Sequence, residues 1–182
     1  PSEILGGLTK RVANRLDLSS GIPVLVGAGD YPTALLGSGA CETGLGSDVT
    51  GTSTIMTIIH DNPVMHPNVS NLLEPSGNWG SFTLLDAGGD AIRWARRAFH
   101  ENQRSYDEVD KAAIQAAAGS SSLFFLPYLN GERFSNAPNS RAQFFGLTSG
   151  HGSAELHRSI LEGVAFSVRL RLDALQGSAG RP

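Results

Sequence analysis

The chain has 182 residues and a formal net charge of −3, and this length suffices for one domain with a proper core. Its positive residues are scattered, which argues against nucleic acid or an anionic membrane as a partner. The single cysteine, Cys41, excludes a disulfide framework within the chain and favours a reducing, cytoplasmic setting. No apolar run is long enough to span a membrane, and no signal peptide is visible. Because the chain begins with Pro1 rather than Met, we expect a fragment of a longer protein.

The first forty residues contain one strand-to-helix junction. Residues 1–21 are expected to form a short helix or a loop, and the apolar run at 22–26 predicts a buried strand. A glycine turn then leads into a helix over residues 30–40, whose small side chains imply close packing against another backbone. Asp30 stands at the junction, where α/β proteins often bind ligands. Its carboxylate can cap the helix, face a cleft, or do both.

Residues 42–60 predict two strands joined by the turn Gly51-Thr52-Ser53. Taken alone, this turn favours a plain hairpin. Its second interpretation is phosphate binding, because backbone N–H groups and two hydroxyls can surround an oxyanion. It is not a Walker-type loop, since Gly-Lys-Ser/Thr occurs nowhere in the chain. Residues 60–80 are rich in Asn, Pro, His and Ser and predict a long loop.

A second glycine turn follows the strand predicted at residues 81–85. Gly88 and Gly89 precede a helix over residues 91–100, a weak signal for an anion site and equally typical of a simple strand-to-helix turn. The arginines of that helix, Arg93 among them, are expected on a solvated face. The five histidines show no metal-ligand spacing, so no metal site is expected, and His157 is interpreted as a helix surface or interface residue.

The second half of the chain predicts two further helices. Ser105 and Glu108 form a capping-box pattern that begins the first. A buried strand at 122–126, a loop at 127–139 and a partly extended segment at 141–147 precede a helix over residues 153–175. On that last helix, Ser159, Gly163 and Ser167 form a narrow stripe suited to close helix contact or to a homodimer.

Three segments together resemble the FGGY family of carbohydrate kinases. They are Gly27-Ala-Gly-Asp-Tyr-Pro-Thr-Ala34, Gly51-Thr-Ser53, and Ala142-Gln-Phe-Phe-Gly-Leu147 followed by Glu155-Leu-x-x-Ser-Ile-Leu-Glu162. The third fits the family's C-terminal signature, and Tyr128-Leu-Asn-Gly-Glu-Arg133 matches just upstream. Each segment is weak alone, but their order and spacing make the set specific, and the resemblance covers nearly the whole chain.

The resemblance implies an α/β fold of the ribonuclease-H-like, actin/hexokinase/Hsp70 type, with a mixed sheet flanked by helices. Residues 1–182 would be the C-terminal lobe. The N-terminal sugar-binding lobe and the adenosine motif expected soon after Gly177 would both be absent.

The resemblance also implies the site and its ligands. ATP and Mg²⁺ would be the cofactors, and Asp30 the general base. Tyr31 stands where the family often has Asn or Gln, which leaves the sugar preference open. The implied site residues are the sugar contacts Asp30 and Tyr31, and the ATP-phosphate contacts Gly51, Thr52, Ser53, Gly88, Gly89 and Arg93.

The function expected from the resemblance is ATP-dependent phosphorylation of a sugar hydroxyl in the cytoplasm. The acceptor would be a ketopentose such as xylulose or ribulose, or a related polyol, and the fragment alone would be inactive. Two alternatives stay open at this point. One is a non-catalytic relative that senses a sugar or a nucleotide. The other is an interaction domain that uses the small-residue stripe for a homodimer.

Overall fold

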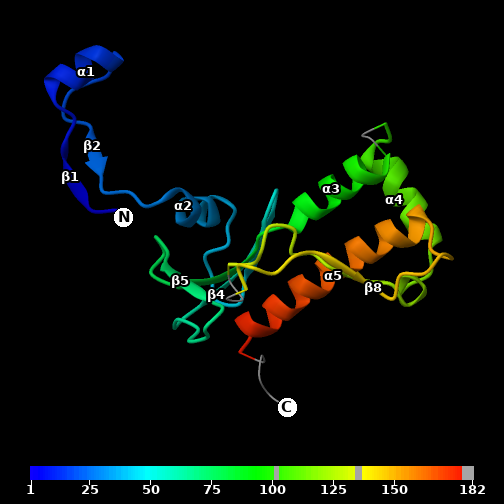
Figure 1. Ribbon diagram of the computed structural model, residues 1–182. Coiled ribbons are helices and arrows are strands. Elements are labelled where there is room, and N and C mark those ends of the chain that lie inside the picture. The colour runs from blue at the N-terminus through cyan, green and yellow to red at the C-terminus, as the bar shows by residue number, and fades with distance from the viewer. Residues whose placement is uncertain (101–102, 134–136, 178–182) are drawn as a thin grey trace.

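The computed structural model describes residues 1–100, 103–133 and 137–177 (Figure 1). The helices are α1 (Lys10–Leu16), α2 (Asp30–Gly37), α3 (Gly88–His100), α4 (Tyr106–Gln115) and α5 (Ser153–Leu175), with a 3-10 turn, η1, at Ser120–Ser122. The strands are β1 (Ile4–Gly7), β2 (Pro23–Leu25), β3 (Gly46–Thr50), β4 (Thr54–His60), β5 (Ser70–Leu73), β6 (Trp79–Leu85), β7 (Phe124–Leu126) and β8 (Gln143–Phe145). Within these residues, none of the helices combines the length and apolar character needed to cross a bilayer.

A four-stranded sheet of order β3-β4-β6-β5 forms the middle of the molecule. The predicted hairpin is confirmed: β3 and β4 pair antiparallel, with Thr50 opposite Thr54. Strand β4 pairs with β6 over its whole length, and its run of β-branched residues suits this central position. Pairings between the named strands are all antiparallel, so the sheet differs from the mixed one expected, although the α/β fold class holds.

Helix α5 joins the parts of the body. It contacts α3 and α4 and also strands β4, β6 and β7; Figure 1 shows these three helices gathered on one side of the molecule. The core between α3, α5 and β7 consists of Ala91, Ala95, Phe125 and Ile160, each at most 4% exposed. Ala91 and Ala95 are the residues that α3 contributes to this core, and Trp94 stacks on the Phe125 ring.

The helix boundaries at α4 and α5 follow the sequence patterns. Ser105 and Glu108 form the predicted capping box, in which the Ser105 N–H donates to the Glu108 carboxylate at 2.7 Å. Helix α5 occupies the residues predicted for it. At α2, by contrast, Gly29 occupies the N-cap position and Asp30 is the first helical residue, so of the roles left open for Asp30 the N-cap position is excluded.

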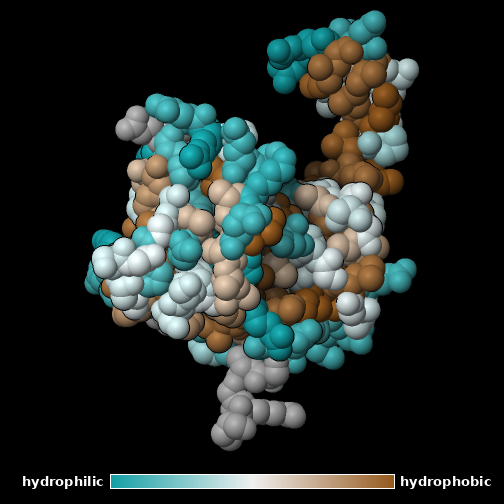
Figure 2. All heavy atoms as spheres, turned by 90° about the vertical axis from the view of Figure 1, so that its right-hand side faces the viewer, coloured by the Kyte–Doolittle hydropathy of each residue, from teal (hydrophilic) through white to brown (hydrophobic). Residues whose placement is uncertain are grey.

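The N-terminal segment forms an arm that stands away from the body (Figures 1 and 2). Residues 1–21 contain a strand, β1, as well as the short helix α1, and β1 pairs antiparallel with β2. The prediction of a buried strand at 22–26 is wrong in its burial, because β2 pairs only with β1 and no other described element covers it. Its apolar side chains stay exposed, as at Leu25.

Three further expectations change in detail. The predicted loop at 60–80 contains strand β5, whose polar residues Ser70 and Asn71 concealed it. Strand β7 is shorter than the predicted strand at 122–126, and only Phe125 within it is buried. The absence of an adenosine motif after Gly177 concerns residues 178–182, which lie outside the described residues.

The small-residue stripe on α5 faces inward. Ser159, Gly163 and Ser167 are all buried. An added Cβ on Gly163 would overlap the carbonyl oxygen of Phe125, so the close contact is with strand β7 rather than with another helix. Because the stripe is filled from within the fold, it offers no surface for the homodimer contact considered from the sequence.

Replacing Gly163 by Ala tests this contact. The methyl group improves helix propensity by about 1 kcal/mol, but overlap with the β7 backbone outweighs it, and we expect a net loss of roughly 1–3 kcal/mol. Urea unfolding measures the change. Gly37→Ala is the matched control, because a Cβ there meets nothing within 4 Å. Equal stability of both variants would contradict the close packing.

His157 is also interior, contrary to the expectation of a surface or interface residue. It is 1% exposed, and neither ring nitrogen has a hydrogen-bond partner among the described residues. Its neighbours are the rings of Phe99 and His100, at centroid distances of 6.3 and 5.7 Å. Burial, with the nearby His100, lowers the pKa of His157 to about 4.

The buried His157 predicts an acid-sensitive fold. The pKa of His157 falls from about 6.5 in the unfolded chain to about 4 in the folded one, so the neutral ring stabilises the fold fully above pH 6.5. As the pH falls towards 4, the free energy of unfolding decreases by roughly 2–3 kcal/mol because the unfolded chain takes up the proton more readily. His157→Leu should therefore lose less stability than the parent over this window in urea titrations. Parallel curves for the two proteins would contradict the assignment.

Candidate functional site

The hairpin turn between β3 and β4 lies directly against the first turn of α3. A Cβ added to Gly89 would overlap the carbonyl oxygen of Gly51, and one on Gly88 would overlap the Thr54 hydroxyl. Only glycine permits this approach at the two positions. A hydrogen bond from the Asp90 N–H to the Thr52 carbonyl, at 3.0 Å, fixes the contact. Two glycine turns that are far apart in the sequence therefore form one surface.

Arg93 lies over this surface, one helical turn beyond Gly89. Its Nη2 donates to the Thr52 hydroxyl at 3.3 Å and pairs with the Asp90 carboxylate at 2.6 Å. The arginine remains largely exposed, with 56% of its side chain accessible, so its charge is partly free for a ligand. The structure thus brings together all six residues that the resemblance implied for phosphate contact: Gly51, Thr52, Ser53, Gly88, Gly89 and Arg93.

A cleft of about 300 Å³ opens beside Arg93. Its lining residues are Asp90, Arg93, Trp94, Arg97, Leu129 and Asn130. The sequence interpretation missed Arg97, Trp94 and Asn130. Arg97 follows Arg93 by four residues and so lies on the same helix face; this spacing was the signal that could have placed it here instead of on a solvated face.

Helix α2 carries Asp30 on its first turn. Asp30 is exposed, and its Oδ1 accepts the Tyr31 N–H at 2.8 Å. The Tyr31 hydroxyl is hydrogen bonded to the Thr57 hydroxyl at 2.5 Å. One turn later, the buried Leu35 lies beside Gly80, which pairs with Ile59 further along the sheet.

These contacts give α2 its direction across the sheet. Tyr31 meets β4 at Thr57, and Leu35 meets the sheet farther from the hairpin turn, so the N-terminal end of α2 faces that turn. Thr57 is three residues from Thr54, about 10 Å along a strand. The first turn of α2, which carries Asp30, thus lies nearer than Leu35 to the end of the sheet where the glycine turns meet. The predicted contact of Tyr31 with a sugar stays a prediction, since its hydroxyl engages Thr57 here.

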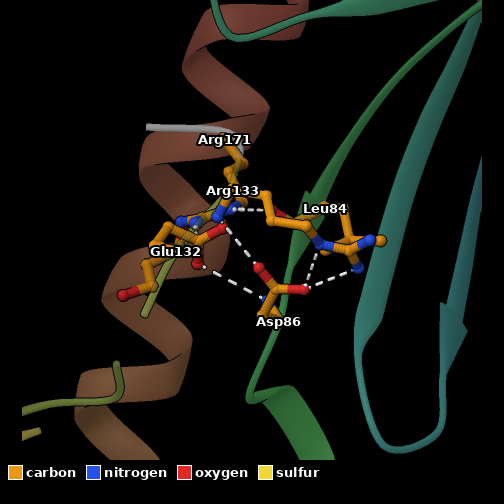
Figure 3. A network of polar contacts seen from close by, with 6 residues as sticks. Leu84, Asp86, Glu132, Arg133 and Arg171 are labelled. Carbon is orange, nitrogen blue, oxygen red and sulfur yellow. Dashed lines mark hydrogen bonds and ion pairs between the residues drawn. The ribbon is translucent and has the colours of Figure 1, made fainter. Parts of the chain in front are cut away.

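A network of charged residues braces the junction between β6 and α3 (Figure 3). Asp86 accepts from Arg133 through both side-chain and backbone N–H groups, at 2.7 and 2.9 Å, and the Asp86 N–H donates to Glu132 at 3.4 Å. Glu132 in turn pairs with Arg171 of α5 at 2.7 Å. Arg171 also donates to the Leu84 carbonyl at 2.9 Å.

The electrostatics of the network favour its charged form. Burial opposes ionisation of Asp86, but the hydrogen bonds and charge of Arg133, with Arg171 behind it, lower the pKa of the Asp86 carboxyl below its usual value. Glu132 and Arg171 are 1% and 7% exposed in their side chains. The network joins β6, the loop that carries Asn130 and α5, and it ends two residues before Gly88.

Sequence and structure comparisons agree on the family. The model for the C-terminal domain of the FGGY family of carbohydrate kinases matches residues 47–182, and the chain belongs to this family. The xylulose kinase of Rhodospirillum rubrum superposes with a TM-score of 0.88 at 25% identity, covering 97% of this chain and 37% of that structure. The match also confirms the ribonuclease-H-like α/β fold class.

The proteins with similar sequences include xylulose kinases and gluconokinases. The xylulose kinase of Klebsiella pneumoniae is 29% identical over 185 residues, and the gluconokinase of Bacillus subtilis is 28% identical over 179. These alignments cover 100% and 92% of this chain, but only 38% and 35% of the relatives. The chain therefore spans less than half the length of these relatives. Residues 1–46 precede the family match, so the predicted single domain over 1–182 stays a prediction there.

The bracing network can be tested with two arginines of α5. Arg171→Met leaves the buried Glu132 charge without this partner, and we expect a loss of about 3–5 kcal/mol in unfolding free energy. Arg169→Met removes a surface ion pair between Arg169 and Asp173, and the Arg169 side chain is 73% exposed. This change should lower the unfolding free energy by at most about 1 kcal/mol. Urea denaturation measures both. Similar losses would show that the buried network does not brace the junction.

Proposed function

We propose that this chain forms part of an ATP-dependent sugar kinase. The observation that carries the proposal is the contact between the Gly51–Ser53 turn and the first turn of α3, with Arg93 laid across it. The hydroxyls of the hairpin turn, the start of a helix and a guanidinium are the groups that bind phosphate. Asp30, on the first turn of α2, is the carboxylate that we propose as the base.

In the proposed reaction, the Asp30 carboxylate accepts the proton of the acceptor hydroxyl. The sugar oxygen forms a bond to the γ-phosphorus of ATP as the bond to the bridging oxygen of ADP breaks. Gly51, Thr52 and Ser53, with Gly88 and Gly89, hold the phosphates in line. Arg93 offsets the negative charge that develops on them, since phosphoryl transfer depends mainly on positioning and electrostatic stabilisation.

The donor set fits ATP phosphates better than a resident metal. Among the described residues, no group of three or more His, Cys, Asp or Glu side chains is arranged to hold a metal ion, and Asp90 is paired with Arg93. Mg²⁺ is commonly bound through substrate phosphates and one or two carboxylates. We therefore propose that Mg²⁺ enters with ATP and neutralises phosphate charge.

The proposed acceptor is a ketopentose such as xylulose or ribulose, or a related polyol. The names of the relatives support a sugar or sugar-acid substrate, as both xylulose kinases and gluconokinases are among them. The relatives are more than twice as long as the aligned region, which supports a chain that works within a longer kinase. A cytoplasmic location is part of the same proposal. The exposed apolar side chains of the N-terminal arm give such an assembly a surface to cover (Figure 2).

Asp30→Asn in the complete kinase tests the proposed base. The amide keeps the size of the side chain but cannot take a proton, so we expect kcat to fall about 10²–10⁴-fold while the Kd for Mg·ATP stays nearly the same. Coupled ADP assays and calorimetry measure the two quantities. Asp17→Asn is the matched control, because Asp17 lies on the arm beyond α1 and should leave both unchanged. Retained turnover in Asp30→Asn would overturn the role of Asp30.

A further inference from the structure

The residue after Asp30 connects its helix to the central sheet. Tyr31 reaches from α2 to β4, where its hydroxyl and that of Thr57 are 2.5 Å apart. Its ring also packs edge-on against Phe82 of β6, at a centroid distance of 5.8 Å. Thr57 and Phe82 are directly opposite each other in the β4–β6 ladder, so one side chain engages both strands. Thr57 is 1% exposed, so Tyr31 makes this contact with a buried residue of the sheet.

We propose that Tyr31 is a positioning residue, which anchors the first turn of α2 to Thr57 and Phe82. It thereby fixes Asp30 relative to the phosphate surface, which consists of the Gly51–Ser53 turn, the first turn of α3 and Arg93. This inference rests on the proposed kinase function. Asp30 is exposed, and its carboxylate accepts a hydrogen bond from the N–H of its own neighbour, so the position of the carboxylate depends on the placement of the turn. Because β4 begins at the hairpin turn that meets α3, the same strand supports both halves of the proposed reaction site.

The chemistry of the anchor suits a permanent contact. Burial raises the pKa of Tyr31, the hydrogen bond with Thr57 partly offsets this, and the Asp48 and Glu74 carboxylates add smaller upward effects. The phenol therefore keeps its proton throughout the physiological range. Its hydroxyl is already engaged by Thr57 and its ring by Phe82, which favours an anchoring role over a sugar contact. A displacement of about 1 Å at a reacting group can lower turnover up to 10²-fold.

The test uses the complete kinase and removes each hydroxyl in turn. Tyr31→Phe keeps the ring, and Thr57→Val keeps the volume of the strand residue, so both lose the same hydrogen bond. We expect each to lower kcat roughly tenfold with KM for sugar and for ATP within about twofold. The double variant should be no slower than either single one, since the interaction is already gone.

Thr83→Val is the matched control. Thr83 lies on the adjoining strand β6 and is 1% exposed, and its hydroxyl has no hydrogen-bond partner among the described residues. It should therefore keep the kcat of the parent. A raised KM for sugar in Tyr31→Phe alone, with Thr57→Val unchanged, would show a sugar contact and overturn the anchoring role. Unchanged kcat in both Tyr31→Phe and Thr57→Val would overturn it as well.

Hydrogen exchange tests the anchor without relying on turnover. The amides of α2 should exchange about fivefold faster in both Tyr31→Phe and Thr57→Val than in Thr83→Val, because the first turn loses its tie to the sheet. Equal exchange in the three variants would refute the anchor. If the parent forms no ADP with any sugar, the proposed function fails, and the exchange result still decides whether Tyr31 anchors α2.

Discussion

The candidate site depends on the close approach of two backbones, the hairpin turn at Gly51 and the start of α3 at Gly88 and Gly89. Any Cβ at these two α3 positions would overlap the turn or the Thr54 hydroxyl. The consequence is one surface built from two segments more than thirty residues apart. Arg93 extends this surface into a cleft that also receives Arg97, Trp94 and Asn130, and the positive side chains there suit a phosphorylated ligand.

Two sets of contacts hold this surface in place. Behind it, the Asp86, Glu132, Arg133 and Arg171 network fastens the end of β6 to the loop before β8 and to α5. Beside it, Tyr31 ties α2 to the middle of β4. Both act on β4 or β6, the strands that border the glycine turns. The molecule thus has a packed scaffold under the hairpin turn, where Gly51 and Thr52 are exposed, an arrangement typical of functional loops.

Local patterns predicted much of the fold. The β3–β4 hairpin, the Ser105 capping box and α5 followed from periodicity and turn chemistry, since their contacts are short-range. Strand β1 was missed because Ile4–Gly7 is short and half glycine, and the burial of β2 was misjudged because apolar content does not reveal which element covers a strand.

Only part of the candidate site could be predicted, because motifs are visible in the sequence whereas contacts between distant elements are not. Its two glycine turns were found from the order of motifs. The burial of His157, the Glu132–Arg171 pair and the Tyr31–Thr57 contact depend on residues brought together by the whole fold, which spacing along the chain does not encode. The sequence shows that a tyrosine follows Asp30, but the contact of its side chain with Thr57 depends on where α2 lies on the sheet.

The most direct measurement is ADP formation by the complete protein with Mg·ATP and a panel of ketopentoses, polyols and gluconate. The proposed kinase function predicts that at least one of these compounds raises ADP formation far above the sugar-independent background, with the phosphorylated sugar appearing in equal amount. If ATP binds but no member of the panel stimulates ADP formation, the phosphate surface would serve binding alone, and the kinase function proposed for this chain would be contradicted.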